Sequence, residues 1–299
     1  MHPNTICPIC GNANLKEKFK VKDHFLTQEI FSIKICDLCD LSITSPIPEN
    51  LESYYSSENY ISHTNTSKTT INKIYLSVRS YTLKTKYNLI KTLSQSHSHS
   101  ILDFGCGTGS FLNYFKSKNW ETYGVESAEK ARKEAQKTME NTIYSTLKEI
   151  PKKKFAVVTL WHVLEHLQNP EKILKDFLPY LENNGIILLA LPNKNSYDAH
   201  RYKPFWAAYD VPRHLWHFSP HAIVKLMNKA GYKLIMKKPM LFDSFYIAWL
   251  SENYKRKNLS PIFKLFKAFF IGAFSNTKAV FSKNYSSIIY IFKKNEIAT

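Results

Sequence analysis

A glycine-rich turn in the middle of the chain has the residue types of a cofactor site. Residues 101–110 read ILDFGCGTGS, an apolar run that ends in Asp103 and continues into three alternating glycines, Gly105, Gly107 and Gly109. Such a turn presents backbone N–H groups at the start of the following helix. The fit to the dinucleotide pattern G-x-G-x-x-G is imperfect, because Ser110 stands at its last position. The Gly-Lys-Ser/Thr ending of a phosphate-binding loop is missing from this stretch altogether.

Two acidic residues around this turn indicate which ligand it binds. Asp103 precedes the first glycine, where a carboxylate repels a pyrophosphate and attracts an ammonium group. Glu126 ends the run TYGVE, 17 residues after Gly109, and is placed to accept hydrogen bonds from two ribose hydroxyls. A nucleoside with a cationic amino-acid tail suits both acids, so the spacing predicts S-adenosylmethionine. Cys106 is interpreted as a small residue that lines this site rather than as a nucleophile.

Four cysteines near the start of the chain form two Cys-x-x-Cys pairs. The spacing can close a tetrahedral four-thiolate site, and zinc is the metal it favours. All four positions would be filled by sulfur, so the site is expected to be structural; four buried free thiols are the alternative. Residues 1–45 carry five basic and five acidic side chains, which argues against binding of nucleic acid by this segment. The expected ligands are Cys7, Cys10, Cys36 and Cys39.

Two histidine clusters supply candidates for a general base, which is most often a histidine. The first, HVLEHL, contains His162, Glu165 and His166. Its alternatives are a divalent metal site and a purely structural role for the glutamate and the second histidine. The second, DVPRHLWHFSP, contains Arg213, His214 and His217. Here we expect one histidine to act as base or acceptor contact and the arginine to clamp an anion.

Alternating strands and helices must position these residues. After residue 100 the pattern predicts helices at 109–118, 127–139 and 170–182, and one that starts after Ser219, which is expected to cap it. Such alternation is typical of an α/β fold with a parallel sheet and helices on both faces. An earlier helix is expected at 71–93, and the aromatic and basic segment 241–285 is expected to be a helical insertion. The expected strands are 100–104, 122–126, a weak one at 141–145, 155–161, 185–192, 232–238 and 286–294.

The order of the motifs resembles one family, the class I S-adenosylmethionine-dependent methyltransferases. LDFGCGTGSFL is similar to their first motif and YGVESA to their second. FAVVTLWHVLEHLQNPEKILKDFLPYLENNGIILLALPN is similar to their region of the fourth and fifth strands. The resemblance covers roughly 100–240, includes methyltransferase-23 and ubiquinone-methyltransferase-like members, and implies a Rossmann-like seven-stranded sheet. It also implies cofactor contacts from Asp103, Gly105, Gly107, Glu126, Trp161 and His162.

A second resemblance concerns the cysteine segment and the chain that follows it. Methyltransferases with a zinc-binding N-terminal domain, including sugar C-methyltransferases, have a similar arrangement. In them a segment similar to SYYSSENYISH folds over the cofactor, which makes Tyr60 and His63 candidates here; packing against the sheet edge is the alternative. We expect a zinc-ribbon-like domain at 1–45, a linker and helical cofactor-covering segment at 46–99, and a methyltransferase domain at 100–299.

Composition sets the expected compartment and partners. The start of the chain, MHPNTICPIC, does not look like a signal peptide, and no run approaches the ~20 apolar residues that span a bilayer, so we expect a cytoplasmic protein. The net charge is +17, and residues 253–295 hold nine Lys and Arg but no Asp or Glu. The apolar helix expected at 261–274 is either a lid or homodimer helix, or an interfacial helix that contacts anionic lipid at the inner membrane face.

These features together predict methyl transfer to a small-molecule, sugar or lipid-linked acceptor, which is expected to be anionic. O-methylation with a histidine base is the favoured reaction. An RNA methyltransferase and a nicotinamide-dependent oxidoreductase are the alternatives. The first is disfavoured because LWHVLEHL replaces the Asn/Asp-Pro-Pro-Tyr type of segment found in many base methyltransferases, and the second because Asp103 and the glycine spacing do not suit a dinucleotide.

Overall fold

The computed structural model describes residues 6–55, 70–94, 98–139, 142–256 and 258–295, without the side chains of 70–77. Tyr60 and His63, expected to cover the cofactor, lie outside the described residues. The chain forms two compact units. Unit 1 comprises Met1–Ser56, His162–Lys175 and Leu189–Ile291, and unit 2 comprises Ser57–Trp161, Asp176–Leu188 and Phe292–Thr299.

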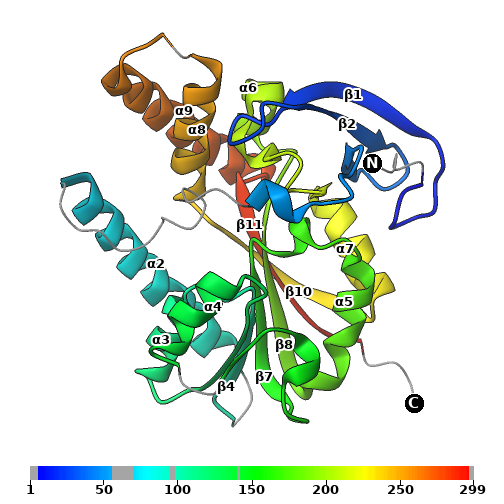
Figure 1. Ribbon diagram of the computed structural model, residues 1–299, viewed down its shortest axis with the longest axis vertical. Coiled ribbons are helices and arrows are strands. Elements are labelled where there is room, and N and C mark those ends of the chain that lie inside the picture. Colours follow the sequence, from blue (N-terminus) through cyan, green and yellow to red (C-terminus); the bar gives the residue numbers. More distant parts are fainter. Residues whose placement is uncertain (1–5, 56–69, 95–97, 140–141, 257, 296–299) are drawn as a thin grey trace. The chain divides into compact units, whose positions relative to one another are not determined.

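A seven-stranded sheet confirms the predicted Rossmann-like fold class (Figure 1). Its strand order is β10-β11-β8-β7-β4-β5-β6. β4 is parallel to both β5 and β7, and β5 is parallel to β6. All seven predicted strands are present: β4 (Ser100–Phe104), β5 (Glu121–Val125), β6 (Ile143–Tyr144), β7 (Phe155–Trp161), β8 (Leu181–Pro192), β10 (Tyr232–Pro239) and β11 (Ser287–Lys294).

Unit 2 holds the glycine turn on a buried strand core. β4 and β7 are apolar on both faces and almost fully buried, as strands covered on both sides must be. Phe115 packs edge-on against Trp120 and against Tyr87 of the long helix α2. The helices of this unit are α2 (Thr70–Leu93), α3 (Ser110–Lys116) and α4 (Glu129–Gln136), with 3-10 turns η2 (Leu147–Glu149) and η4 (Leu178–Tyr180).

A second sheet lies in unit 1 and involves the cysteine segment. Its strands are β1 (Leu15–Lys22), β2 (Ile30–Cys36), β3 (Ser42–Ser45) and β9 (Trp216–His217), in that order. β3 pairs antiparallel with β9, with Ile43 opposite Trp216. Residues 1–45 therefore share a sheet with a strand from the C-terminal half of the chain, because three short strands bury too little apolar surface alone.

The remaining helices belong to unit 1 and include the predicted helical insertion. The segment expected as one helix at 170–182 ends earlier, because the chain enters β8 at Leu181. Ser219 caps α7 as expected, since its hydroxyl accepts from the Ala222 N–H. The helices are η1 (Glu52–Tyr55), η3 (Leu164–His166), α5 (Pro170–Asp176), α6 (Tyr197–Tyr202), η5 (Lys203–Phe205), η6 (Ala207–Tyr209), α7 (Pro220–Lys229), α8 (Asp243–Lys255) and α9 (Pro261–Ser282).

α8 and α9 form an antiparallel hairpin, in which the two helices lie side by side (Figure 1). The face of α9 that is buried carries small residues, so the two helices approach closely. A Cβ added to Gly272 would lie 2.7 Å from the Phe245 ring of α8, which leaves room only for glycine. No helix in the described part of the chain is long and apolar enough to cross a membrane.

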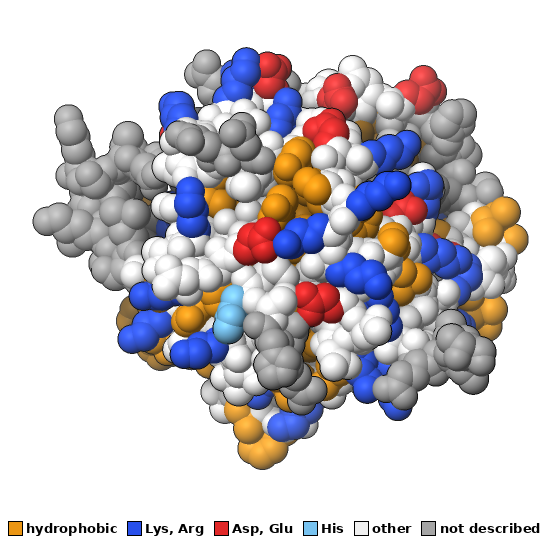
Figure 2. All heavy atoms as spheres, turned by 90° about the horizontal axis from the view of Figure 1, so that it is seen from below, with side chains coloured by type: hydrophobic (Ala, Val, Ile, Leu, Met, Phe, Trp, Pro, Cys, Tyr) orange, Lys and Arg blue, Asp and Glu red, His pale blue; other side chains and the backbone are white. Residues whose placement is uncertain are grey.

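The surface reflects the positive net charge of +17. On the face shown in Figure 2, Lys and Arg side chains are scattered among apolar and uncharged ones, and acidic side chains are sparser. The basic side chains of this face are therefore spread out rather than gathered in one stripe.

Candidate active site and metal centre

The glycine turn of unit 2 has the backbone shape that its sequence requires. Gly105, Gly107 and Gly109 all have positive φ, which non-glycine residues rarely adopt. The N–H groups of Gly105 and Cys106 donate to the Val125 carbonyl at the end of β5. Cys106 is buried, and burial raises the pKa of its thiol, so the thiol is neutral.

Asp103 lies at the end of β4 as a fully buried carboxyl group. Thr159 of β7 donates a hydrogen bond of 2.6 Å to its Oδ1 atom, and the two residues are register partners in the sheet. Burial raises the pKa of Asp103 to about 7, although the Thr159 hydrogen bond acts in the opposite direction. An ammonium group that replaces water at this carboxylate would stabilise its ionised form.

Glu126 connects the second strand of the site to the glycine turn. Its Oε2 atom accepts the Gly107 N–H at 2.8 Å, and its Oε1 atom accepts the Ala128 N–H at 2.9 Å. Each carboxylate oxygen has a further lone pair for a hydroxyl donor. The geometry of this turn is consistent with recognition of a ribose.

Sequence reasoning missed two basic residues of α2 that lie at this site within unit 2. The Lys86 ammonium group lies 3.8 Å from the centre of the Trp161 ring at the end of β7. Arg79 donates a hydrogen bond to the hydroxyl of Ser110, the first residue of α3. Their spacing of seven residues, two helical turns, puts both on one face of α2. This spacing in the sequence could have indicated that the two residues act at the same site.

His162, the first residue after β7, is held as a cation in unit 1. It has a φ of 56°, an uncommon conformation outside glycine. The two nitrogens of its ring each contact a carboxylate. Nδ1 lies 3.4 Å from Glu165 Oε1 and Nε2 lies 3.1 Å from Asp243 Oδ2. Burial alone would lower the pKa of His162, but the two carboxylates raise it to about 10. A permanently charged imidazolium is a poor general base at neutral pH.

Three other side chains of unit 1 lie close together. Two come from the first histidine cluster and one from the second. Glu165, His166 and His214 each present one ligand atom, and these atoms lie within 4.8 Å of one another. Glu165 is only 1% exposed; its Oε1 atom is ion-paired with His162 Nδ1 at 3.4 Å, and its Oε2 atom has no hydrogen-bond partner among the described residues. Burial favours its neutral form, yet the contact with the His162 cation holds the pKa of Glu165 below its usual value. The carboxylate is therefore ionised and faces the two rings.

Hydrogen bonds assign the tautomers of these two rings. His166 Nδ1 lies 3.1 Å from the Arg213 carbonyl and 3.0 Å from the Tyr55 hydroxyl, and His214 Nδ1 lies 2.9 Å from the Ala208 carbonyl. A carbonyl only accepts, so each Nδ1 carries a proton. Burial lowers the pKa of His166 to about 4, which keeps that ring neutral and leaves a lone pair on its Nε2 atom. The neutral His166 ring, together with Glu165 and His214, can bind a divalent cation or take up a proton.

The other members of the second cluster have structural partners. His217 is buried and its Nε2 atom lies 2.9 Å from the Thr44 hydroxyl, which itself donates to the His214 carbonyl. Arg213, expected to clamp an anion, is instead buried with its guanidinium bonded to Asp210 and to Asp23 at 2.9 Å. Its charge is already neutralised inside the protein, which corrects that expectation.

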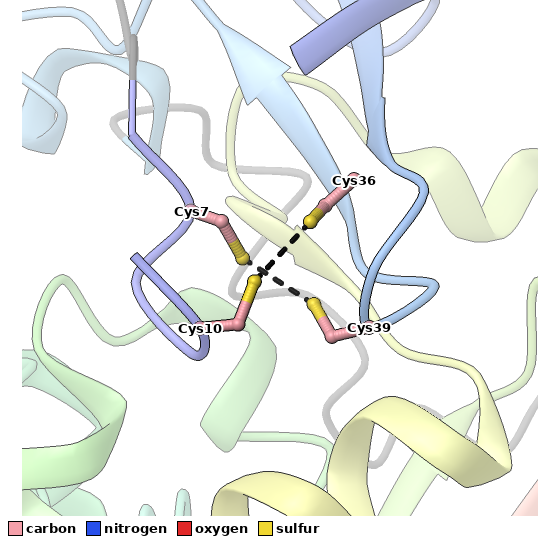
Figure 3. A group of neighbouring side chains, drawn as sticks. All are labelled: Cys7, Cys10, Cys36 and Cys39. Carbon is pink, nitrogen blue, oxygen red and sulfur yellow. Dashed lines mark hydrogen bonds between the residues drawn. The ribbon is translucent and has the colours of Figure 1, made fainter. Parts of the chain in front are cut away.

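The four cysteines of unit 1 converge as their spacing predicts. Figure 3 shows the sulfurs pointing toward one another, two from each loop. The Sγ–Sγ distance is 3.4 Å both between Cys7 and Cys39 and between Cys10 and Cys36. The two loops share one backbone pattern, in which the N–H four residues after the first cysteine donates to that cysteine's carbonyl and the donor residue, Gly11 or Asp40, has positive φ.

The electrostatics of this cluster favour a cation. A hydrogen bond from Cys39 lowers the pKa of Cys7 to about 5, whereas that same contact raises the pKa of Cys39. The neighbouring thiols thus stabilise a first thiolate, and the charge of that thiolate makes ionisation of a second thiol unfavourable. Four thiolates at this spacing need a positive ion, and the donor set and tetrahedral arrangement fit zinc.

Comparison with known proteins identifies the family. Residues 75–237, more than half of the chain, match a family described as methyltransferase domain. A mitochondrial ubiquinone biosynthesis O-methyltransferase of Candida albicans is 25% identical over 177 residues, 54% of this chain and 48% of that protein. The ubiquinone biosynthesis O-methyltransferase of Rickettsia canadensis is 23% identical over 199 residues, 61% of this chain and 81% of its own. The chain spans about half the length of the Candida albicans relative.

A solved structure shares the fold. It comes from a Haloferax volcanii complex between the Trm112 methyltransferase activator and a methyltransferase, and it matches with a TM-score of 0.51. The identity is 10%, and the match covers 71% of this chain and 90% of the other. Because the family match includes the glycine turn, Glu126 and the histidine cluster at 162–166, the chain belongs to the methyltransferase domain family.

Proposed function

We propose that the protein transfers the methyl group of S-adenosylmethionine to an oxygen atom of a small-molecule acceptor. Asp103, before the glycine turn, and Glu126, which accepts the Gly107 N–H, support the choice of donor, because an ammonium group and a ribose match these acids. The two ubiquinone biosynthesis O-methyltransferases among the relatives support transfer to oxygen. The observation that carries the acceptor chemistry is the buried, ionised Glu165 beside His214 and the neutral His166.

Methyl transfer is an in-line displacement in which a C–O bond forms as the C–S bond breaks. The sulfonium leaves as neutral S-adenosylhomocysteine, so the donor needs no acid catalyst. The acceptor hydroxyl must lose its proton, and His166 Nε2 is the proposed proton acceptor. Glu165 would stabilise the imidazolium that forms, in the way that a buried carboxylate supports a catalytic histidine. His214, whose Nδ1 atom is fixed by the Ala208 carbonyl, would share this task.

A divalent cation would fit the same three residues. Glu165, His166 and His214 supply one oxygen and two nitrogens, and both Nδ1 atoms are already fixed by hydrogen bonds, as is usual for metal-binding histidines. When bound, such an ion would act as a Lewis acid that lowers the pKa of the acceptor hydroxyl.

The cysteine centre is proposed to bind structural zinc within a domain at 1–45. Its four sulfurs leave no open coordination position, so it would stabilise the loops rather than catalyse. The acceptor is proposed to be anionic or lipid-linked, and the protein to be cytoplasmic with peripheral contact to a membrane. The excess of basic residues after position 192, 18 against 5 acidic, supports these last proposals.

The test is methyl transfer from labelled S-adenosylmethionine to a panel of phenols, hydroxy acids and lipid-linked alcohols. We expect His166→Ala and His214→Ala each to lower kcat by about 10²–10⁴-fold while the affinity for the cofactor is unchanged. His221→Ala, at an exposed position of α7, is the matched control. Full activity of the His166→Ala/His214→Ala double variant would refute the base. Activity of the chelator-treated wild type, with and without added Mg²⁺, Mn²⁺ or Zn²⁺, decides whether a metal assists.

If the labelled methyl group enters RNA but none of the hydroxyl acceptors, the protein is an RNA methyltransferase and not an O-methyltransferase of small molecules. Calorimetric binding of a nicotinamide dinucleotide in preference to S-adenosylmethionine would overturn the donor assignment.

A further inference from the structure

The α8–α9 hairpin exposes many large apolar side chains, whereas the buried face of α9 carries mostly small ones. The buried residues of α9 are Lys264, Ala268, Gly272, Ser275 and Ala279. On the opposite side the phenylalanines are half exposed, with Phe266 at 59% and Phe274 at 47%. This is the reverse of a helix that packs its apolar face on the protein core. The exposed set on α9 is Ile262, Phe263, Leu265, Phe266, Phe269, Phe270, Phe274, Val280 and Phe281.

α8 extends the same apolar surface with aromatic residues. Tyr246 and Trp249 are exposed and lie 6.2 Å apart between ring centroids. Phe245 of α8 stacks on Phe269 of α9 at 5.6 Å. The two helices therefore present one apolar surface, which we call the hairpin face. Surface patches of this kind mark contacts with proteins or membranes.

Cations are interspersed with the aromatic rings of the hairpin face. Lys267 lies 5.0 Å from the centre of the Phe263 ring, and Lys278 lies 5.5 Å from that of Phe274. Long lysine side chains can cover an apolar surface with their methylene groups and extend the ammonium group beyond it. Aromatic rings mixed with lysines are typical of helices that lie in the interface of an anionic bilayer.

The acidic residues of the hairpin do not balance this charge. Residues 241–285 contain only Asp243 and Glu252. Asp243 pairs with His162, and Glu252 is buried beside Arg256. A symmetric dimer through the hairpin face would bring each lysine toward the lysines of the other copy, because such a contact pairs a patch with itself. An anionic surface complements the charge, whereas a second copy does not.

We propose that the hairpin face binds an anionic lipid bilayer. Phe266, Phe270 and Phe274 enter the headgroup region, and Lys267 and Lys278 contact lipid phosphates. The inference is independent of the methyl acceptor, because vesicle binding requires no turnover. It also assigns the lipid contact to α8 and α9 rather than to basic residues elsewhere on the chain.

The experiment is flotation of the full-length protein with phosphatidylcholine vesicles that contain or lack phosphatidylglycerol. We expect flotation with the anionic vesicles, weakened by salt. The variant Phe266→Ser/Phe270→Ser/Phe274→Ser should lower the partition coefficient by about tenfold or more per side chain. Ile235→Ser, an exposed apolar position of β10, is its matched control. The replaced side chains are exposed, so the variants should fold, and thermal unfolding monitored by circular dichroism checks this.

A second pair of variants tests the charges. Lys267→Gln/Lys278→Gln should lower binding to anionic vesicles by about fivefold per lysine, whereas the equally charged change Lys237→Gln/Lys238→Gln in β10 should have a smaller effect. Equal effects of the two pairs would mean that net charge alone drives binding, and would overturn the proposal. So would flotation of the serine variant at the wild-type level. Sedimentation velocity without vesicles tests whether the hairpin face binds a second copy of the chain instead. A wild-type dimer, a monomeric serine variant and no vesicle binding would assign the face to that second copy.

Discussion

Replacement of Asp103 by Asn should stabilise the cofactor-free protein and weaken the cofactor site. Burial raises the pKa of Asp103 to about 7, from a usual value near ~3.9. Between these two pH values the unfolded chain loses this proton while the folded protein keeps it. The free energy of unfolding therefore falls by up to about 1.4 kcal/mol per pH unit, and by about 4 kcal/mol in all once the pH exceeds 7. The folded protein is therefore most stable at low pH, where Asp103 is neutral, and loses this stability as the pH rises.

Asp103→Asn removes the ionisation and leaves an amide oxygen for the Thr159 hydroxyl. At pH 8 the variant should be more stable than the wild type by up to about 4 kcal/mol, whereas at pH 5 the two should differ much less. Its affinity for S-adenosylmethionine should be lower by about 10–100-fold, because a charge-assisted hydrogen bond to the ammonium group is lost. Urea unfolding at the two pH values measures the first effect, and isothermal calorimetry measures the second.

The comparison at pH 5 is the internal control, since there the wild-type carboxyl group is neutral in the folded protein. A variant that is less stable than the wild type at pH 8 without cofactor would refute the assignment of a buried, unfavourable charge. A variant with unchanged cofactor affinity would refute the role of Asp103 in binding the ammonium group.

Three further outcomes follow from packing and ion pairs. Gly124→Ala should destabilise the protein by about 1–3 kcal/mol in urea unfolding, because the new methyl group would lie 2.7 Å from Cys106 Sγ. Arg213→Leu should cost about 3–5 kcal/mol by leaving Asp23 buried without a counter-charge, and the double variant with Asp23→Asn, which removes that charge and keeps an acceptor for the N–H groups of Phe25 and Leu26, should recover part of this loss; a stable but inactive Arg213→Leu protein would instead restore the anion-clamp role. Cys36→Ser should abolish stoichiometric zinc in elemental analysis of the purified protein and lower its melting temperature, and a variant that keeps both would contradict a four-sulfur centre.

The sequence predicted the parts of the site that depend on local spacing. The glycine turn, Glu126 and the two cysteine loops each require particular residues within a few positions, so their patterns are legible without a fold. β4 and β7 were predictable for a similar reason, because buried parallel strands are nearly continuous apolar runs. Interior boundaries were less accurate: the helix expected at 170–182 gives way to β8 because strand pairing competes with helix formation there.

Contacts between distant parts of the chain were not predictable. Arg213 was expected at an acceptor and is paired with Asp23, 190 positions away. The role of His162 depends on Asp243, which no local motif connects to it. Both cases concern charged side chains whose partner is chosen by the folded topology. Of the catalytic candidates, Glu165, His166 and His214 come together from both predicted clusters, and that grouping is also a property of the fold.

Asp40 links the proposed zinc centre to residues outside the two cysteine loops. It closes the second cysteine loop and also binds the Lys194 ammonium group at 2.5 Å and the Asn195 amide at 2.9 Å, immediately after β8. A loop that loses its metal would release these two residues, and with them the segment that leads to the buried Asp198, which holds Trp206 and Ser286. Loss of the proposed zinc would therefore disturb unit 1 as far as the surroundings of Asp198, well beyond the four sulfurs.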